Sequence, residues 1–344
     1  MRWKFRLPSE VFAVGLAFLF GMVVLLLTGY PPVKALLALF RGAFGSRNAV
    51  GQTLTQATPI LFTSLAFLLA FRSGVFNIGV EGQFLMGAFV TALSGIGLRG
   101  LPFPIHALLA LFLGGLGGAV YALFPALLKV YLGAHEVITT MMLSYVALYL
   151  TSYFVNYPLK APGWVAQTDL VPPSARLPRI LPPTQLSFAF PIALGFALFV
   201  FWFLERTVPG FSIRAVGLNP KASENRGIPV RKYQLFAFVL SGFIAGVGGG
   251  GEILGVHGRF VDGFSPGYGW DGIAVSLVGR LHPLGCIFAS VLFGMLRAGG
   301  MTMTRMTKVP LDLSLIIQAL VILLVAAPFC IQYLRNLFRK GRPS

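Results

Sequence analysis

The fold of this chain is decided between Phe188 and Gly251, where two apolar runs flank a polar segment. The first run, Phe188–Leu204, reads FAFPIALGFALFVFWFL, and the second, Tyr233–Gly251, reads YQLFAFVLSGFIAGVGGGG. The segment between them, Arg206–Lys232, reads RTVPGFSIRAVGLNPKASENRGIPVRK and carries six Lys or Arg and one acidic residue. Apolar runs that approach ~20 residues can cross a bilayer as helices. The pattern predicts two membrane helices joined by a basic connection.

The rest of the chain repeats this pattern. Of the 344 residues, 56% are hydrophobic and 11% are charged, whereas a soluble domain carries about 25% charged residues. We therefore predict an all-α, polytopic transmembrane helical bundle that forms a single domain over residues 1–344. The other candidate spans are Val11–Leu27, Leu54–Phe71, Val75–Ser94, Ile105–Tyr131, Val137–Tyr157, Leu284–Arg297 and Leu311–Leu334. With a short run at Gly272–Gly279, about ten crossings are expected.

The distribution of Lys and Arg predicts the orientation of the bundle. Both ends of the chain are basic, at Arg2, Lys4 and Arg6 and at Arg335, Arg339, Lys340 and Arg342. Ten crossings place both termini and the 206–232 loop on one side, which the positive-inside rule makes the cytoplasm. The proline-rich stretch Pro158–Leu186 then lies outside, as a loop able to touch an external partner. The amphipathic stretch Pro32–Gly45 is expected along the outer interface.

The net charge of +17 does not indicate a nucleic-acid partner, because the charges flank apolar spans rather than lining one face of a soluble module. Cys286 and Cys330 sit in apolar runs, and the four histidines are scattered, so no metal site is predicted. No catalytic motif is present, and no P-loop. The chain is predicted not to be an enzyme, and any ATP-driven step requires an ATPase on another chain.

Polar residues inside the apolar runs are the candidate functional residues, because polar groups in a bilayer are costly. Asn77, Glu81 and Gln83 cluster in FNIGVEGQF. They form either a hydrogen-bonded knot between helices or part of a solute pathway. Glu252 follows the glycine run Gly248–Gly251, which either packs closely against other helices or unwinds. Glu136 is expected to be a solvated capping residue.

The segment Gly263–Gly279 has the composition of a broken helix, since Pro266 and two glycines interrupt it. Asp271 is expected to cap a short helix that begins at Gly272. Trp270 offers a face on which a planar ring can stack. Half-helices with exposed ends are a common way for transporters to bind polar solutes near mid-membrane.

Four phrases carry a resemblance to a known family. They are FNIGVEGQFLMGAF (Phe76–Phe89), GLNPKASENRGIPVRKY (Gly217–Tyr233), LSGFIAGVGGGGEILGVHGRF (Leu240–Phe260) and GYGWDGIAVSLVGRLHPLG (Gly267–Gly285). The chain resembles the inner-membrane permeases of bacterial binding-protein-dependent ABC importers, in the group that serves branched-chain amino acids, simple sugars and nucleosides. The first and last phrases are most similar to the nucleoside branch.

The resemblance implies a multi-pass permease in the bacterial inner membrane, paired with a second permease that is homologous or identical. It implies ATPase subunits that bind ATP-Mg, while this chain binds no cofactor, and an external solute-binding protein. The coupling helix maps onto Gly217–Gly227, with Gly217, Asn219, Pro220, Glu224, Arg226 and Gly227 as candidate coupling residues. Asn219 is the expected N-cap and Pro220 the first helical residue. Ser223 and Glu224 depart from the family pattern, which has an Ala-like and an aromatic residue there.

The expected function is passage of a small polar solute, with a nucleoside first and a sugar or branched-chain amino acid as the alternatives. The pathway would be lined by Asn77, Glu81, Gln83, Glu252, Trp270 and Asp271. An ion-coupled secondary transporter that relays protons through Glu81 or Asp271 is the rival of another class.

Overall fold

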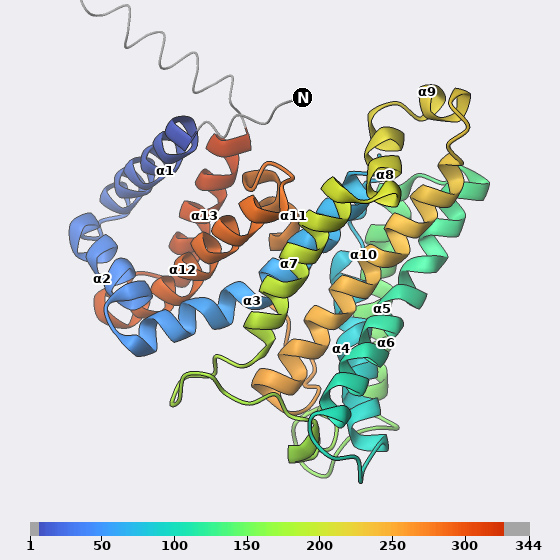
Figure 1. The fold of residues 1–344 in the computed structure, drawn as a ribbon. Helices are drawn as coiled ribbons and strands as arrows, with labels where there is room; N and C mark the ends of the chain where they lie inside the picture. Colours follow the sequence, from blue (N-terminus) through green and yellow to red (C-terminus); the bar gives the residue numbers. More distant parts are fainter. Residues whose placement is uncertain (1–6, 327–344) are drawn as a thin grey trace, which may run out of the picture. The chain divides into compact units, whose positions relative to one another are not determined.

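The computed structural model describes residues 7–326, and within that range the chain forms thirteen α-helices and no β-strand (Figure 1). The predicted all-α, polytopic bundle is confirmed. The described residues divide into two compact units, 7–53 with 292–326 and 54–291. Both boundaries fall inside a helix, the first in α3 (Arg47–Phe71) and the second in α12 (Pro283–Thr307).

The first unit contains α1 (Leu7–Leu27), α2 (Pro32–Phe44), the start of α3, most of α12 and α13 (Leu311–Ala326). The α2 helix confirms the amphipathic pattern, because Ala35, Leu39 and Ala43 are buried while Lys34 and Arg41 are exposed. Small residues allow its close packing on α12: a Cβ at Gly299 would lie 3.0 Å from Leu39 Cγ. The predicted place of α2 at the outer interface stays a prediction.

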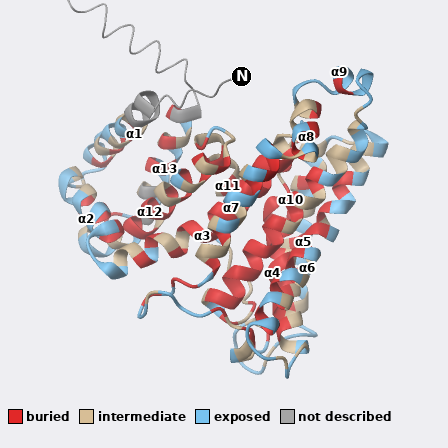
Figure 2. Ribbon diagram, viewed as in Figure 1, coloured by how far each residue is buried: buried red, intermediate tan, exposed pale blue. Residues whose placement is uncertain are grey.

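The second unit contains the remaining helices. They are α4 (Val80–Gly97), α5 (Ile105–Leu132), α6 (Glu136–Asn156), α7 (Ala189–Arg206), α8 (Val208–Leu218), α9 (Pro220–Asn225), α10 (Val230–Glu252) and α11 (Tyr268–Val278). Among them, α10 packs most extensively against α4 and α5. Figure 2 shows that α10 and α4 are buried along most of their length, whereas few residues of α6 are buried.

Glycines let α10 approach its neighbours until the backbones touch. A Cβ at Gly87 of α4 would overlap the backbone of Gly246, and a Cβ at Gly118 of α5 would overlap the carbonyl of Gly242. Such small-residue contacts are a main means of helix association in membranes. The run Gly248–Gly251 is helical and buried, so it packs closely and does not unwind. The irregular turn comes later, as a single π-helical turn over Ile253–His257.

The stretch 158–186 contains no α-helix and only one 3-10 turn, Pro173–Ala175, as its prolines predict. It covers the C-terminal end of α10: Leu177 N donates to the Leu254 carbonyl at 3.0 Å, and Val171 N donates to the Gly258 carbonyl at 2.9 Å. The 206–232 loop precedes the N-terminal end of α10. The two loops therefore lie at opposite ends of this helix, as drawn in Figure 1.

Six helices in residues 7–326 are long and apolar enough to cross a membrane: α3, α5, α6, α7, α10 extended to His257, and α12. Three expectations need correction. The span expected at Val75–Ser94 becomes helical only at Val80, the loop at 206–232 contains an unforeseen helix, α8, and the short helix expected at Gly272 begins at Tyr268. Cys330, the basic tail and the end of the last span lie outside the described residues.

Candidate functional site

A half-helix, α11, packs against α4 in the second unit. The eleven residues of α11 span about 16 Å at 1.5 Å per residue, roughly half of a ~30 Å hydrocarbon core. Its first carbonyl, that of Tyr268, accepts a hydrogen bond from Thr63 Oγ1 at 2.8 Å, inside α3. Beyond its end, the Leu281 carbonyl accepts from Arg72, just past the end of α3. The helix thus begins inside the bundle, and the predicted broken helix is confirmed.

Glu81 of α4 binds the N-terminal end of this half-helix. Its Oε2 accepts from Gly269 N at 2.5 Å, and its Oε1 accepts from Ser265 Oγ at 2.6 Å. A Cβ at Gly269 would overlap the Glu81 backbone, so only glycine lets α11 and α4 meet there. The first N–H groups of a helix and its dipole both stabilise a carboxylate placed beside them. Glu81 is 7% exposed and caps α11 from another helix.

The expectation that Asp271 is the cap was wrong. The N-cap position is Gly267, which is left-handed at φ 90° and offers no side chain, and Asp271 lies in the first turn. The sequence pattern of Asp before Gly is a valid local signal, but the capping group comes from a residue far away in the chain. Trp270, by contrast, is 36% exposed at the start of the half-helix, beside Gly269, which faces Glu81.

Asn77 and Gln83 are joined in a buried knot. Asn77 Nδ2 donates to Gln83 Oε1 at 2.9 Å and to Ser241 Oγ at 3.0 Å, while Gln83 Nε2 donates back to Asn77 Oδ1 at 3.1 Å. Asn77 Oδ1 also accepts from Gly79 N at 3.0 Å. The knot fixes the non-helical approach to α4 against the middle of α10. These contacts are those of the structural alternative, and a pathway role for Asn77 and Gln83 stays a prediction.

Glu252 lies apart from these residues, at the C-terminal end of α10. It is 5% exposed, and its Oε1 is 3.7 Å from His257 Nε2. The His257 ring contacts Phe264 edge to face, with centroids 5.5 Å apart, on the segment that leads to α11. Of the six candidate pathway residues, Glu81, Trp270 and Asp271 gather at the start of α11, Asn77 and Gln83 form the knot, and Glu252 stands by itself under the 158–186 loop.

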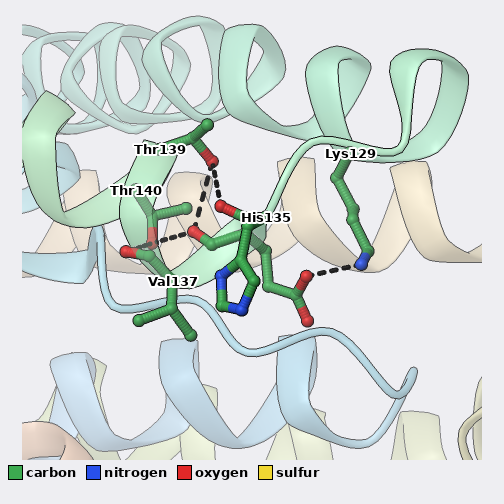
Figure 3. A network of polar contacts seen from close by, with 6 residues as sticks. Lys129, His135, Val137, Thr139 and Thr140 are labelled. Carbon is green, nitrogen blue, oxygen red and sulfur yellow. Dashed lines mark hydrogen bonds and ion pairs between the residues drawn. The ribbon is translucent and has the colours of Figure 1, made fainter.

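Glu136 is the first residue of α6, just after the turn from α5, so the expected capping role was wrong, and its side chain is partly exposed at 19%. Its Oε2 lies 2.5 Å from Lys129 Nζ, and this ion pair is drawn as the dashed line beside the labelled Lys129 in Figure 3. The N-cap position of α6 is His135, whose side chain makes no capping bond. Two threonines of the first turn bond back to the backbone instead: Thr139 Oγ1 donates to the His135 carbonyl at 3.2 Å and Thr140 Oγ1 to the Glu136 carbonyl at 2.7 Å (Figure 3). The pair closes this turn as a structural clasp.

Of the candidate coupling residues, Pro220 and Glu224 lie on the short helix α9, Asn219, Arg226 and Gly227 flank it, and Gly217 belongs to α8, so the helix is shorter than the expected Gly217–Gly227. Asn219 Oδ1 accepts from Ala222 N at 3.0 Å, and Pro220 is the first residue of α9, as predicted. Gly227 ends the turn at φ 79°, where Ile228 N donates to the Ser223 carbonyl at 3.0 Å. Ser223 is buried, and the other residues of α9 are exposed. An exposed helix with a defined start and end is able to present one face to a partner.

Two further parts of this end were missed: helix α8, and Arg72, which contacts the candidate coupling residue Gly217. Thr207 caps α8 through its Oγ1, which accepts from Gly210 N at 3.1 Å, and Pro209 follows the cap. The Thr-x-Pro pattern was an available signal for this helix. A Cβ at Gly217, the next-to-last residue of α8, would overlap the Arg72 carbonyl. Arg72 in turn donates from Nε to the Leu281 carbonyl at 3.0 Å, so it connects α8 with the turn that follows α11.

Ser265, Gly269 and Ser241 were also missed as partners of the candidate residues. Small polar residues near a buried carboxylate or amide are the natural donors, but nothing in a single sequence pairs positions that are more than 150 residues apart. For Gly269, the available signal was its position in the GYGWDG phrase, which carries the family resemblance.

Comparisons with known proteins agree with the geometry. Residues 49–326 match the family described as branched-chain amino acid transport system / permease component. The chain is 34% identical over 339 residues to the guanosine ABC transporter permease protein NupP of Bacillus subtilis, covering 97% of this chain and 96% of NupP. It is 31% identical to the nucleoside ABC transporter permease protein NupB of Lactococcus lactis, covering 93% and 90%. It is 32% identical to the glucose ABC transporter permease protein TsgB13 of Haloferax volcanii, covering 94% and 88%. No solved structure matches the chain.

Proposed function

We propose that this chain, which belongs to the branched-chain amino acid transport system / permease component family, forms the nucleoside pathway of an ABC importer. Membership in a family of transport permeases confirms the prediction of a multi-pass membrane transporter rather than an enzyme. The nucleoside is proposed because NupP and NupB carry guanosine and nucleoside in their names. Glucose, named for TsgB13, is the second candidate.

The observation that carries the proposal is the pairing of an exposed, capped α9 with a half-helix inside the bundle. ATP-Mg bound by separate ATPase subunits would supply the energy, and α9 would receive the movement of those subunits. Gly217 and Arg72 offer a physical route from that end to α11. Gly217 packs against the Arg72 backbone, and the Arg72 side chain donates to the Leu281 carbonyl just after α11. Nucleotide would then bias the bundle between two arrangements, without any chemical change of the solute.

At the opposite end of α10, the 158–186 loop would receive the solute-loaded binding protein. Trp164 is fully exposed there, at 102% of its reference area, and Val165 and Leu170 are about half exposed. Exposed aromatic and apolar groups on an ordered loop are typical of docking surfaces. A second permease, homologous or identical, would complete the pathway. The cytoplasmic side is assigned to α9 by the positive-inside rule, in the plasma membrane of a bacterium.

Two loop replacements of known position test this arrangement. In the first variant, a flexible Gly/Ser linker replaces Asn219–Gly227. In the second variant, a Gly/Ser linker of the same length replaces Lys160–Trp164. The proposal expects the first variant to lose the ATPase subunits and keep the binding protein, and the second to do the reverse. Both interactions are measured by co-purification, and ATP-dependent uptake should fail in both variants. Normal uptake with the first linker would contradict the coupling role of α9.

A further inference from the structure

An open apolar groove runs between α7 and α10, away from the residues discussed so far. It encloses about 530 Å³ and is lined by Ile192, Gly195, Phe196, Phe199, Leu240 and Phe243. All six residues are apolar, and both helices are long and apolar enough to span a membrane. The occupant must therefore be apolar along the groove and belong to the membrane.

Gly195 has no structural reason to be glycine other than the space beside it. A Cβ there would meet nothing within 4 Å, and its φ is not in the left-handed region. Glycine in a helix interior is less stabilising than alanine. The glycine at position 195 therefore lowers the stability of α7 and leaves the groove wider. The glycines that pack α4, α5 and α10 are different, because a Cβ at Gly87 or Gly118 would overlap backbone atoms.

Basic side chains stand at one end of the groove. The rings of Phe203 and Phe236 hold the two helices together there, with centroids 6.2 Å apart. Within about one and a half turns of this contact lie Arg206, Arg231 and Lys232, all of them exposed. The acid next to Arg206, Glu205, is engaged by Arg214 at 3.0 Å and does not cancel this charge.

The distances fit one lipid molecule. Eleven helical residues separate Gly195 from Arg206, a rise of about 16 Å, and eight separate Leu240 from Lys232, about 12 Å. Half of a ~30 Å hydrocarbon core is about 15 Å. The groove thus lies at the depth of an acyl tail when the basic residues lie at the level of the headgroups. Each Lys or Arg at that level adds to the attraction for anionic headgroups.

We infer that the α7–α10 groove seats one acyl chain of an anionic phospholipid, whose headgroup is bound by Arg206, Arg231 and Lys232. The inference depends on the membrane-spanning part of the proposed function and on no step of transport. A lipid bound between these helices would fix their spacing, and α7 leads directly into α8 and α9 through Thr207. Lipid composition would then affect how the coupling end is held.

Native mass spectrometry of the purified full-length chain tests this, with phosphatidylglycerol and phosphatidylcholine of identical acyl chains as the probes. We expect one tightly retained phosphatidylglycerol per chain, with phosphatidylcholine bound about 10-fold more weakly or worse. Gly195→Phe fills the groove and should weaken retention of phosphatidylglycerol by a similar factor. Replacing Arg206, Arg231 and Lys232 with Gln should reduce phosphatidylglycerol to the phosphatidylcholine level.

Two matched controls exist in the chain. Gly97→Phe adds the same side chain at another helical glycine with open space around it, and Lys34, Arg41 and Arg47 offer three exposed basic residues for the same change to Gln. Both controls should leave retention unchanged. Equal loss in the controls, or equal binding of the two lipids, would overturn the inference. So would a Gly195→Phe chain that keeps its lipid but no longer pairs with the second permease, since the occupant would then be a protein helix. These readouts do not involve uptake, so a failed function and a failed lipid site are distinguishable.

Discussion

At the scale of single residues, Glu81 separates the two transport mechanisms. As a cap, it needs only oxygen acceptors for Gly269 N and Ser265 Oγ. As a proton relay in an ion-coupled transporter, it would need a titrating carboxyl group. The two roles therefore differ in what a neutral isostere does.

We expect Glu81→Gln to keep most ATP-driven uptake, because the amide oxygen still accepts from Gly269 N. Glu81→Ala removes both acceptors and should destabilise the folded chain by about 1.5–3 kcal/mol, the range for hydrogen bonds to charged groups. Its uptake should fall roughly 10-fold or more, which corresponds to about 1.4 kcal/mol, because the start of α11 is then no longer fixed to α4. The measurements are thermal unfolding in detergent and uptake into proteoliposomes. Loss of uptake in Glu81→Gln as complete as in Glu81→Ala would support the relay.

The sequence identifies Glu81 as a candidate but cannot say what it binds. A carboxyl group inside an apolar run is visible from composition alone. Its partner Gly269 is 188 residues away, so their contact depends on how α4 and α11 meet. The same reason explains the wrong cap: Asp271 satisfies the local rule for a cap, and the fold supplies a carboxylate at that end from elsewhere.

At the scale of elements, α9 was predicted well because its signals are local. Asn219, Pro220 and Gly227 set its start and end within nine residues, and all three do so in the structure. The helices α8 and α11 were predicted poorly. The start of α11 is fixed by contacts with α3 and α4, which the local sequence does not reveal. In the same way, the apolar run that begins at Val75 does not show that the Asn77 knot keeps the first residues of this run out of a helix.

The cap of α9 gives a second prediction. Asn219→Ala removes the acceptor for Ala222 N and should cost about 1 kcal/mol of helix stability, so that the ATPase subunits bind about fivefold more weakly. Asn219→Asp keeps the acceptor and should bind nearly as the native chain does. Affinity is measured by titrating ATPase subunits onto the permease in nanodiscs. Equal affinity of the Ala and Asp variants would show that the ordered start of α9 has no part in docking.

Close packing of α10 gives a third prediction. Gly246→Ala places a methyl group against the Gly114 carbonyl and the Gly118 backbone, and overpacking of this kind costs about 1–3 kcal/mol. Gly195→Ala is the matched control, because the same methyl group meets nothing within 4 Å. It should stabilise α7 by up to roughly 1 kcal/mol through helix propensity. Thermal unfolding of both purified variants distinguishes them, and a Gly246→Ala chain as stable as the native one would rule out backbone contact at this crossing.

At the scale of the whole molecule, composition alone predicts a polytopic helical membrane protein, because few soluble folds tolerate so little charge. It does not predict which residues face solute. In the sequence, Gln83 and Trp270 are equally plausible pathway residues. Only the packing of the helices shows that Gln83 is buried and Trp270 is exposed. In the proposed function, the two loops at the ends of α10 would serve the ATPase subunits at one end and a binding protein at the other.

Uptake by proteoliposomes tests the central claim most directly. The chain is assembled with the ATPase, second permease and binding protein of its importer, and accumulation of labelled guanosine is measured with ATP or with ADP. The account predicts accumulation only with ATP and with the binding protein, competed by unlabelled nucleosides and not by glucose. Accumulation driven by an ion gradient in the absence of ATP would contradict it.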